Sequence, residues 1–293
     1  MSVKGRFDGW TAARWLSEAH QHVSLDVWTA RARAGDLLLE GEPIRSLDHV
    51  VRGGNRVVHV ERDHVEPSVP WAIDLLHDDP ALCVVDKPAP MPMHPSGRYH
   101  LHSLSCLLER AFPGETYLPV HRLDADTTGV AVFARHRRAA RVLARQFEVR
   151  GVHKRYLARV VGRVEHEQFE CALPVSSGPE GEGRRSARSG RAALTRVRCV
   201  ARETHSSVVL AEPVSGRTNQ IRLHLAMSGH PIVGDEAYGR GASMKSGAEL
   251  LHLHAWTLTL EHPDSARRLT LESPMPDWVG AAASRQLHQI REA

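Results

Sequence analysis

The sequence predicts an α+β protein built from two units. Apolar positions at helical spacing and β-branched or alternating runs typical of strands both recur along its 293 residues. Helical patterns and short strands at the N-terminus form one group over residues 8–62. Two prolines over residues 63–72 favour an extended linker, and residues 73–293 form the larger second unit. A chain of this length has ample apolar material for a core.

The first unit is expected to hold two helices and a small sheet. Apolar residues at helical spacing predict a helix over residues 10–20. Ser24 is the expected N-cap of a second helix, which Gly35 ends. Apolar runs at residues 37–39 and 56–60 then predict strands separated by a turn and a loop.

The second unit is expected to contain buried strands and amphipathic helices. Residues 82–85 and 130–134 are apolar and largely β-branched, which favours strands. Helices are expected over residues 101–112 and 137–150, the second ending at Gly151.

Two further elements of the second unit carry polar side chains. Residues 152–162 alternate as a strand, with Tyr156 on the same face as two apolar residues. Thr218 is the expected cap of a later helix, which Gly229 ends.

Arginine dominates the basic side chains. Only four of the 38 lysine and arginine residues are lysines, and the formal net charge is +4. Arginine binds phosphate through two hydrogen bonds and stacks on bases, so the bias favours a nucleic-acid partner. A coding preference for arginine would produce the same bias, and one sequence leaves both interpretations open.

The composition favours no membrane, metal or redox function. No apolar run approaches the length of a membrane span, and the N-terminus lacks the apolar core of a secretion signal, so we expect a cytoplasmic protein. The four cysteines lie far apart, and the twenty histidines follow no ligand spacing. We therefore expect no metal and no cofactor, and a monomer is the default.

A polar cluster lies between two predicted strands, at residues 121–129. It holds the carboxylates Asp124 and Asp126 with an arginine, a histidine and two threonines, and Gly129 closes it. A turn needs only one or two polar residues and a glycine, whereas loops between strands often display reactive groups. A well-capped turn and a catalytic loop are both consistent with this pattern.

The same cluster resembles the motif His-Arg-Leu-Asp-x-x-Thr-Ser-Gly of the RluA-type RNA pseudouridine synthases. Thr128 replaces the usual serine and keeps the hydroxyl. Residues 82–97 resemble the family's strand that ends in Lys-Pro and the His-Pro loop after it, and residues 154–161 resemble its Lys-x-Tyr motif.

The last motifs of this family are matched further along the chain. Residues 216–225 resemble Gly-Arg-Thr-x-Gln-Ile-Arg-x-His, with Asn219 where a histidine is usual, and residues 230–235 match His-Pro-Ile-x-Gly-Asp. The resemblance covers about residues 73–275, with the motifs in the expected order. It implies a catalytic domain built on a long mixed, mainly antiparallel sheet, preceded by an αL-type RNA-binding domain at residues 8–62.

The resemblance also implies roles for individual side chains. Asp124 is the expected catalytic carboxylate, Arg222 the cation that keeps it ionised, and Tyr156 the ring that stacks on the target uracil. Whether Asp124 attacks the sugar or removes a proton from it stays open, and Asp126 is the rival carboxylate. RNA contacts are expected from His121, Arg122, Thr127, Lys154, Arg184, Arg185 and Arg217. Of these, Arg122 is expected to fill the space that the everted target base leaves.

The implied activity is the isomerisation of specific uridines in ribosomal or transfer RNA, with RNA as the only partner. The alternative is a catalytically silent RNA-binding or ribosome-assembly protein on the same scaffold. Joint presence of Asp124, Tyr156 and Arg222 argues against that alternative. A metal-dependent hydrolase is a third class, which a chelator would inhibit.

Overall fold

The structure is a computed structural model that describes all residues except 22, 63, 177–189, 240–249 and 293. The chain divides into two compact units, Met1–Val65 and Glu66–Ala293. No helix of the described part is long and apolar enough to cross a membrane.

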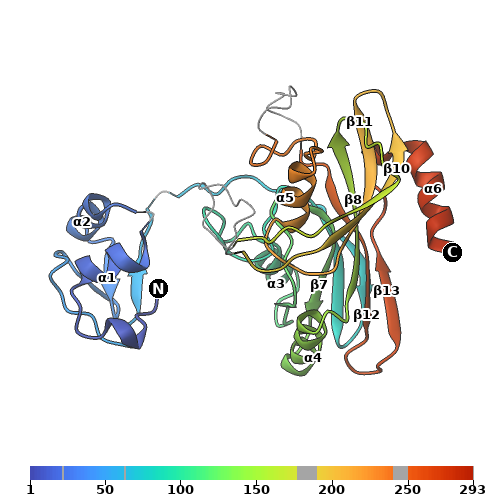
Figure 1. Ribbon diagram of the computed structural model, residues 1–293. Coiled ribbons are helices and arrows are strands. Elements are labelled where there is room, and N and C mark those ends of the chain that lie inside the picture. Colours follow the sequence, from blue (N-terminus) through green and yellow to red (C-terminus); the bar gives the residue numbers. More distant parts are fainter. Residues whose placement is uncertain (22, 63, 177–189, 240–249, 293) are drawn as a thin grey trace. The chain divides into compact units, whose positions relative to one another are not determined.

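The first unit has the two expected helices and a small antiparallel sheet of order β2-β1-β3 (Figure 1). The Ser24 hydroxyl accepts the Val27 N–H at 3.4 Å, and Gly35 ends the second helix with φ +79°, so both cap predictions are confirmed. Trp15, Leu16 and Trp28 are buried at its centre. The elements are η1 (Gly5–Phe7), α1 (Ala12–Ala19), α2 (Leu25–Ala34), β1 (Leu37–Leu39), β2 (Glu42–Pro43) and β3 (Val57–His59).

The second unit is built on a ten-stranded sheet of order β4-β5-β7-β12-β8-β11-β10-β9, with β13 beside β12 and β6 beside β7. Its strands are β4 (Asp74–Asp78), β5 (Leu82–Lys87), β6 (Leu118–Pro119), β7 (Thr128–Ala134), β8 (His153–Val161), β9 (Gln168–Cys171), β10 (Thr195–Arg202), β11 (Ser206–Pro213), β12 (Leu253–Glu261) and β13 (Arg268–Glu272). β7 and β12 run parallel, and the other described pairings are antiparallel. The expected mixed, mainly antiparallel sheet is confirmed.

Helices cover both faces of this sheet (Figure 1). They are α3 (Leu104–Ala111), α4 (Arg137–Glu148), α5 (Gln220–Met227) and α6 (Gly280–Glu292), with the short η2 (Asp277–Val279) before α6. Alternation along the strands divides the core: Phe133 of β7 packs in one cluster with α3, whereas Val132 packs in another with α4. Ala158 of β8 packs with α5, and Leu157 packs with α6.

The expected linker is in part tied to the second unit. The carboxylate of Glu66 accepts the backbone N–H groups of His100, Leu101 and His102 at 2.7–2.9 Å. The side chain of Trp71 also packs edge-on against the His102 ring. The chain from residue 66 onward therefore belongs to the second unit.

The predicted cap of α5 is wrong. The helix begins at Gln220, and the residue before it, Asn219, adopts a left-handed conformation without a side-chain cap. The Gln220 side chain instead reaches back and accepts the Arg217 N–H at 3.0 Å. Thr218 lies one residue too early to cap this helix.

Gly129 allows β7 and β12 to approach closely. Its φ is +108°, and a Cβ atom at this position would clash with the backbone of Ala255 on β12. Because Ala255 is its partner in the short parallel ladder, only glycine fits here.

We expect Gly129→Ala to lower the free energy of unfolding by about 2–5 kcal/mol, since the methyl group meets backbone and the positive φ strains the new residue. Urea denaturation measures the change. Gly151→Ala is the matched control, because a Cβ there meets only ordinary contacts. Equal stability of the two variants would contradict the close approach of β7 and β12.

Candidate active site

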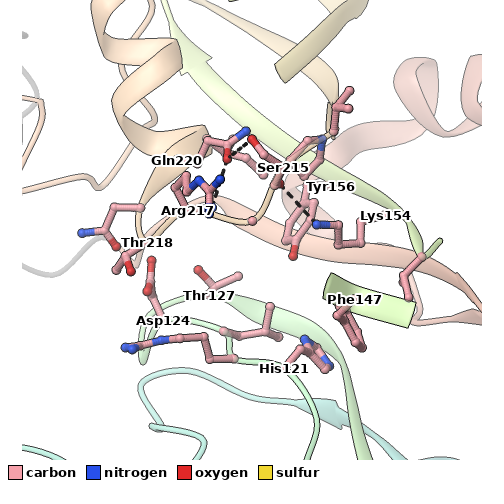
Figure 2. Close-up of a pocket in the computed structure, with 18 of the residues that line it drawn as sticks. His121, Asp124, Thr127, Phe147, Lys154, Tyr156, Ser215, Arg217, Thr218 and Gln220 are labelled. Atoms are coloured by element: carbon pink, nitrogen blue, oxygen red, sulfur yellow. Dashed lines mark hydrogen bonds between the residues drawn. The ribbon is translucent and has the colours of Figure 1, made fainter. Parts of the chain in front are cut away.

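A cavity of about 470 Å³ opens between the loop before β7, strand β8 and the segment that leads into α5 (Figure 2). The predicted site residues that the structure describes all line it: His121, Arg122, Asp124, Thr127, Lys154, Tyr156, Arg217 and Arg222. Arg184 and Arg185 lie outside the described residues. Asp126 is exposed and is not part of the cavity wall, so of the two carboxylates in the motif only Asp124 faces it.

A buried lysine holds the loop that carries Asp124. Lys87, at the end of β5, donates to the carbonyl oxygens of Met91 at 2.7 Å and of Ala125 and Pro88 at 3.0 Å. The Met91 N–H also donates to the Ala125 oxygen at 2.8 Å. Burial lowers the pKa of Lys87 to about 7, although the negative charges of Asp126, Asp124 and Asp86 act to raise it. These bonds fix the backbone beside Asp124.

Arg222 of α5 lies between two carboxylates. Its Nε and Nη2 donate to the two oxygens of Asp235 at 2.8 Å, and its Nη1 lies 3.7 Å from Oδ2 of Asp124. Burial alone would lower the pKa of Arg222. The hydrogen bond to Asp235 and the charges of Asp235 and Asp124 outweigh this effect and raise the pKa. Asp235 is fully buried, whereas the Asp124 side chain is 22% exposed toward the cavity. The two predicted partners are therefore brought together.

Tyr156 projects from β8 between Ala211 of β11 and Ala255 of β12. Its ring contacts the apolar cluster under α3 and the one under α5. Burial and the nearby charge of Asp124 raise the pKa of its phenol. The group therefore stays protonated at neutral pH and can donate a hydrogen bond.

His121 is held as a neutral imidazole at the other end of the cavity. Its Nε2 lies 3.0 Å from the Val132 nitrogen and accepts that N–H, which leaves the ring proton on Nδ1. The ring stacks on Phe147 of α4, with centroids 5.2 Å apart. Burial and the charge of Lys154 lower the pKa of His121 to about 4.

Several residues that shape the site have no role that could be predicted from their sequence pattern. Asp235, which fixes Arg222, was visible only as the last residue of a motif, and Lys87 only as a strand end. Gln220 is buried and holds the segment before α5, and Phe147 had been assigned only to the buried face of its helix. A long-range contact defines each of these roles. Among the described residues no group of three or more histidine, cysteine or acidic side chains could hold a metal ion.

Comparison with known proteins identifies the family. A family model described as RNA pseudouridylate synthase matches residues 81–227. The chain is 35% identical over 287 residues to the ribosomal large subunit pseudouridine synthase D of Nitrosomonas europaea, covering 93% of this chain and 79% of that one. It is 34% identical over 212 residues to the dual-specificity RNA pseudouridine synthase RluA of Vibrio vulnificus, covering 69% and 83%. The chain therefore belongs to the RluA-type RNA pseudouridine synthase family, whose members are isomerases.

A solved structure agrees with this assignment at the level of the fold. The protein titled human RNA pseudouridylate synthase domain containing 1 matches with a TM-score of 0.62, at 23% identity, over 78% of this chain and 98% of that chain. The resemblance seen in the sequence motifs is confirmed.

We expect the pKa of His121 to rise from about 4 when Lys154→Met removes the neighbouring positive charge. Nitrogen-detected NMR of the histidine rings measures this, and in the wild type it should show the proton on Nδ1 at neutral pH. Arg196→Gln, which removes an exposed charge on β10, should leave the pKa of His121 unchanged. A doubly protonated His121 ring at pH 6 would contradict the assignment.

Proposed function

We propose that this synthase isomerises uridine in large-subunit ribosomal RNA and that Asp124 is its catalytic carboxylate. One observation carries the catalytic assignment: Asp124 and Arg222 meet at 3.7 Å on the wall of a cavity that Tyr156 also lines. The name of the Nitrosomonas europaea relative supports a ribosomal substrate.

The reaction breaks the bond between uracil N1 and the anomeric carbon C1′. The base then turns, C5 bonds to C1′, the C5 proton leaves and N1 gains a proton. The difficult step is loosening the glycosidic bond, which a carboxylate assists by attacking C1′ or by taking the neighbouring sugar proton. Either role requires an ionised Asp124 beside the sugar.

The surroundings of Asp124 favour its charged form. A uracil that enters the cavity displaces water and would raise the pKa of a lone carboxyl group. Arg222 opposes this, and Asp235 fixes its guanidinium so that Nη1 remains directed at Asp124. The pair therefore exists before RNA binds and needs no rearrangement at the moment of reaction.

The target nucleotide must leave its stack to reach Asp124. Arg122 is exposed on the cavity wall, next to Asp124 in the sequence, and is the candidate to fill the vacated space. Residues 8–62 are the candidate αL-type RNA-binding domain, since Arg14 and Arg33 are exposed on their helices.

We expect Asp124→Asn to abolish pseudouridine formation and to leave RNA binding largely intact, because asparagine keeps the shape but cannot act as a nucleophile or base. Mapping pseudouridine in total RNA from cells carrying the wild type, the variant or no protein measures activity and identifies the substrate. Asp126→Asn is the matched control and should remain active. Pseudouridine formed by the Asp124→Asn variant would refute the catalytic assignment. If cells without the protein lost pseudouridines only from transfer RNA, the ribosomal substrate would be refuted.

We expect Tyr156→Phe to preserve stacking on the uracil and RNA affinity, while kcat falls by about 10²–10⁴-fold if the phenol takes part in proton transfer during the rearrangement. Single-turnover kinetics separates binding from chemistry. A wild-type rate would limit Tyr156 to stacking.

A further inference from the structure

Besides Arg122 and Arg222, four cations line the cavity that holds Asp124. They are Arg150 just after α4, Lys154 of β8, Arg191 before β10, and Arg217 before α5. Within the described part of the chain none of them pairs with a carboxylate. The cavity wall also includes Glu148, but this carboxylate pairs with Arg145 at 2.8 Å. The positive charge on this side is thus not neutralised by the protein.

Arg217 lies on a rigid segment. The Gln220 side chain donates to Leu194 O at 2.9 Å and to the Thr195 hydroxyl at 3.0 Å, and accepts from the Ser215 hydroxyl at 2.8 Å and the Arg217 N–H at 3.0 Å. Every polar atom of this buried amide group therefore has a partner, and the segment it holds is ordered without RNA.

The Nε of Arg217 is itself buried without a hydrogen-bond partner. Burial, followed by the charges of Arg191 and Arg150, lowers the pKa of Arg217. A buried guanidinium N–H without an acceptor is costly, so the protein maintains an unfavourable arrangement here.

Lys154 lies on the same side of the cavity as Arg217, across from Asp124 and Thr127 (Figure 2). Its Nζ makes one long hydrogen bond, to the Ser215 oxygen at 3.3 Å, and so retains donors for a ligand. Burial lowers its pKa to about 8. Like Arg217, it is a partly desolvated cation without a counter-ion.

We propose that Lys154 and Arg217 form a subsite for a phosphate group directly attached to the target uridine. Two unneutralised cations on the wall of one cavity fit a phosphodiester, whose oxygens accept charge-assisted hydrogen bonds from lysine and arginine. The proposal rests on the assignment of this cavity as the uridine site, since the phosphate must be close enough for its nucleoside to reach Asp124. Arg150 and Arg191, which are exposed, add long-range attraction.

The test uses uridine, uridine 3′-monophosphate, uridine 5′-monophosphate and inorganic phosphate as probes of the intact protein, with affinities from calorimetry or NMR titration at low salt. One of the two monophosphates should bind at least about tenfold more tightly than uridine, as one charge-assisted contact allows. Lys154→Gln and Arg217→Gln should remove this gain, whereas Lys154→Arg should keep it. Arg196→Gln is the charge-matched control and should bind like the wild type.

Several outcomes would overturn the subsite. These are monophosphates that bind no better than uridine, inorganic phosphate that binds as well as the nucleotides, or glutamine variants that retain the gain. Asp124→Asn separates this proposal from the catalytic one, because it should bind the monophosphates at least as tightly as the wild type. If Asp124→Asn still makes product, the catalytic assignment fails while the binding result stands.

A second measurement uses RNA itself. Large-subunit ribosomal RNA free of protein should bind Arg217→Gln with a slope of log K against log salt about 1 smaller than for the wild type. Thermal unfolding confirms that the variant is folded. An unchanged slope would show that Arg217 meets no phosphate.

Discussion

The geometry of the site depends on Arg222, because its guanidinium group interacts with two carboxylates at once. Asp235 is fully buried and binds the guanidinium through two hydrogen bonds, which fix its plane and position. One cation then faces two anions, so the three groups together carry a net negative charge. Asp124, the partly exposed member, lies 3.7 Å from Nη1. A carboxylate in direct bidentate contact would be a weaker nucleophile and base, so a partner held slightly away by another acid suits the chemistry.

Sheet order is what brings this group together. Asp124 precedes β7 and Arg222 follows β11, yet β12, from near the C-terminus, is inserted between β7 and β8. The parallel contact of β7 with β12 sets how far the Asp124 loop lies from Tyr156, and Gly129 lets the strands approach closely enough. Lys87 then fixes the loop from beneath by hydrogen bonds to the backbone. Two long-range contacts, the pairing of β7 with β12 and the hydrogen bond from Lys87 to Ala125, thus position one short motif.

These contacts also mark what could be predicted from the sequence. Residues 130–134 have the pattern of a buried strand, and Ser24 and Gly35 have local capping chemistry, so both were predicted correctly. The pairing of Asp124 with Arg222 followed only from the family resemblance. Threonine is a common N-cap residue, which favoured Thr218 as the cap of α5. In the structure the Gln220 side chain instead binds the backbone before the helix, because a hydrogen bond to Leu194 orients its amide group. Lys87 belongs to a motif of the family, but its burial could not be predicted, since a lysine is expected at the surface and its hydrogen bonds to three carbonyl groups form only in the fold.

The cavity is electrically polarised: one wall carries the Asp124 anion and the other carries Lys154 and Arg217. A phosphate is repelled by the first and attracted by the second, while uracil is neutral and can lie against Tyr156 between them. A nucleotide can therefore enter in one orientation, with its backbone toward the cations and its sugar toward the carboxylate. On the proposed assignment, the Asp124 anion acts on the sugar and would otherwise repel an RNA strand. By placing unneutralised cations across the cavity, the fold offsets that repulsion at the phosphate and keeps the charge of Asp124 available for the glycosidic bond.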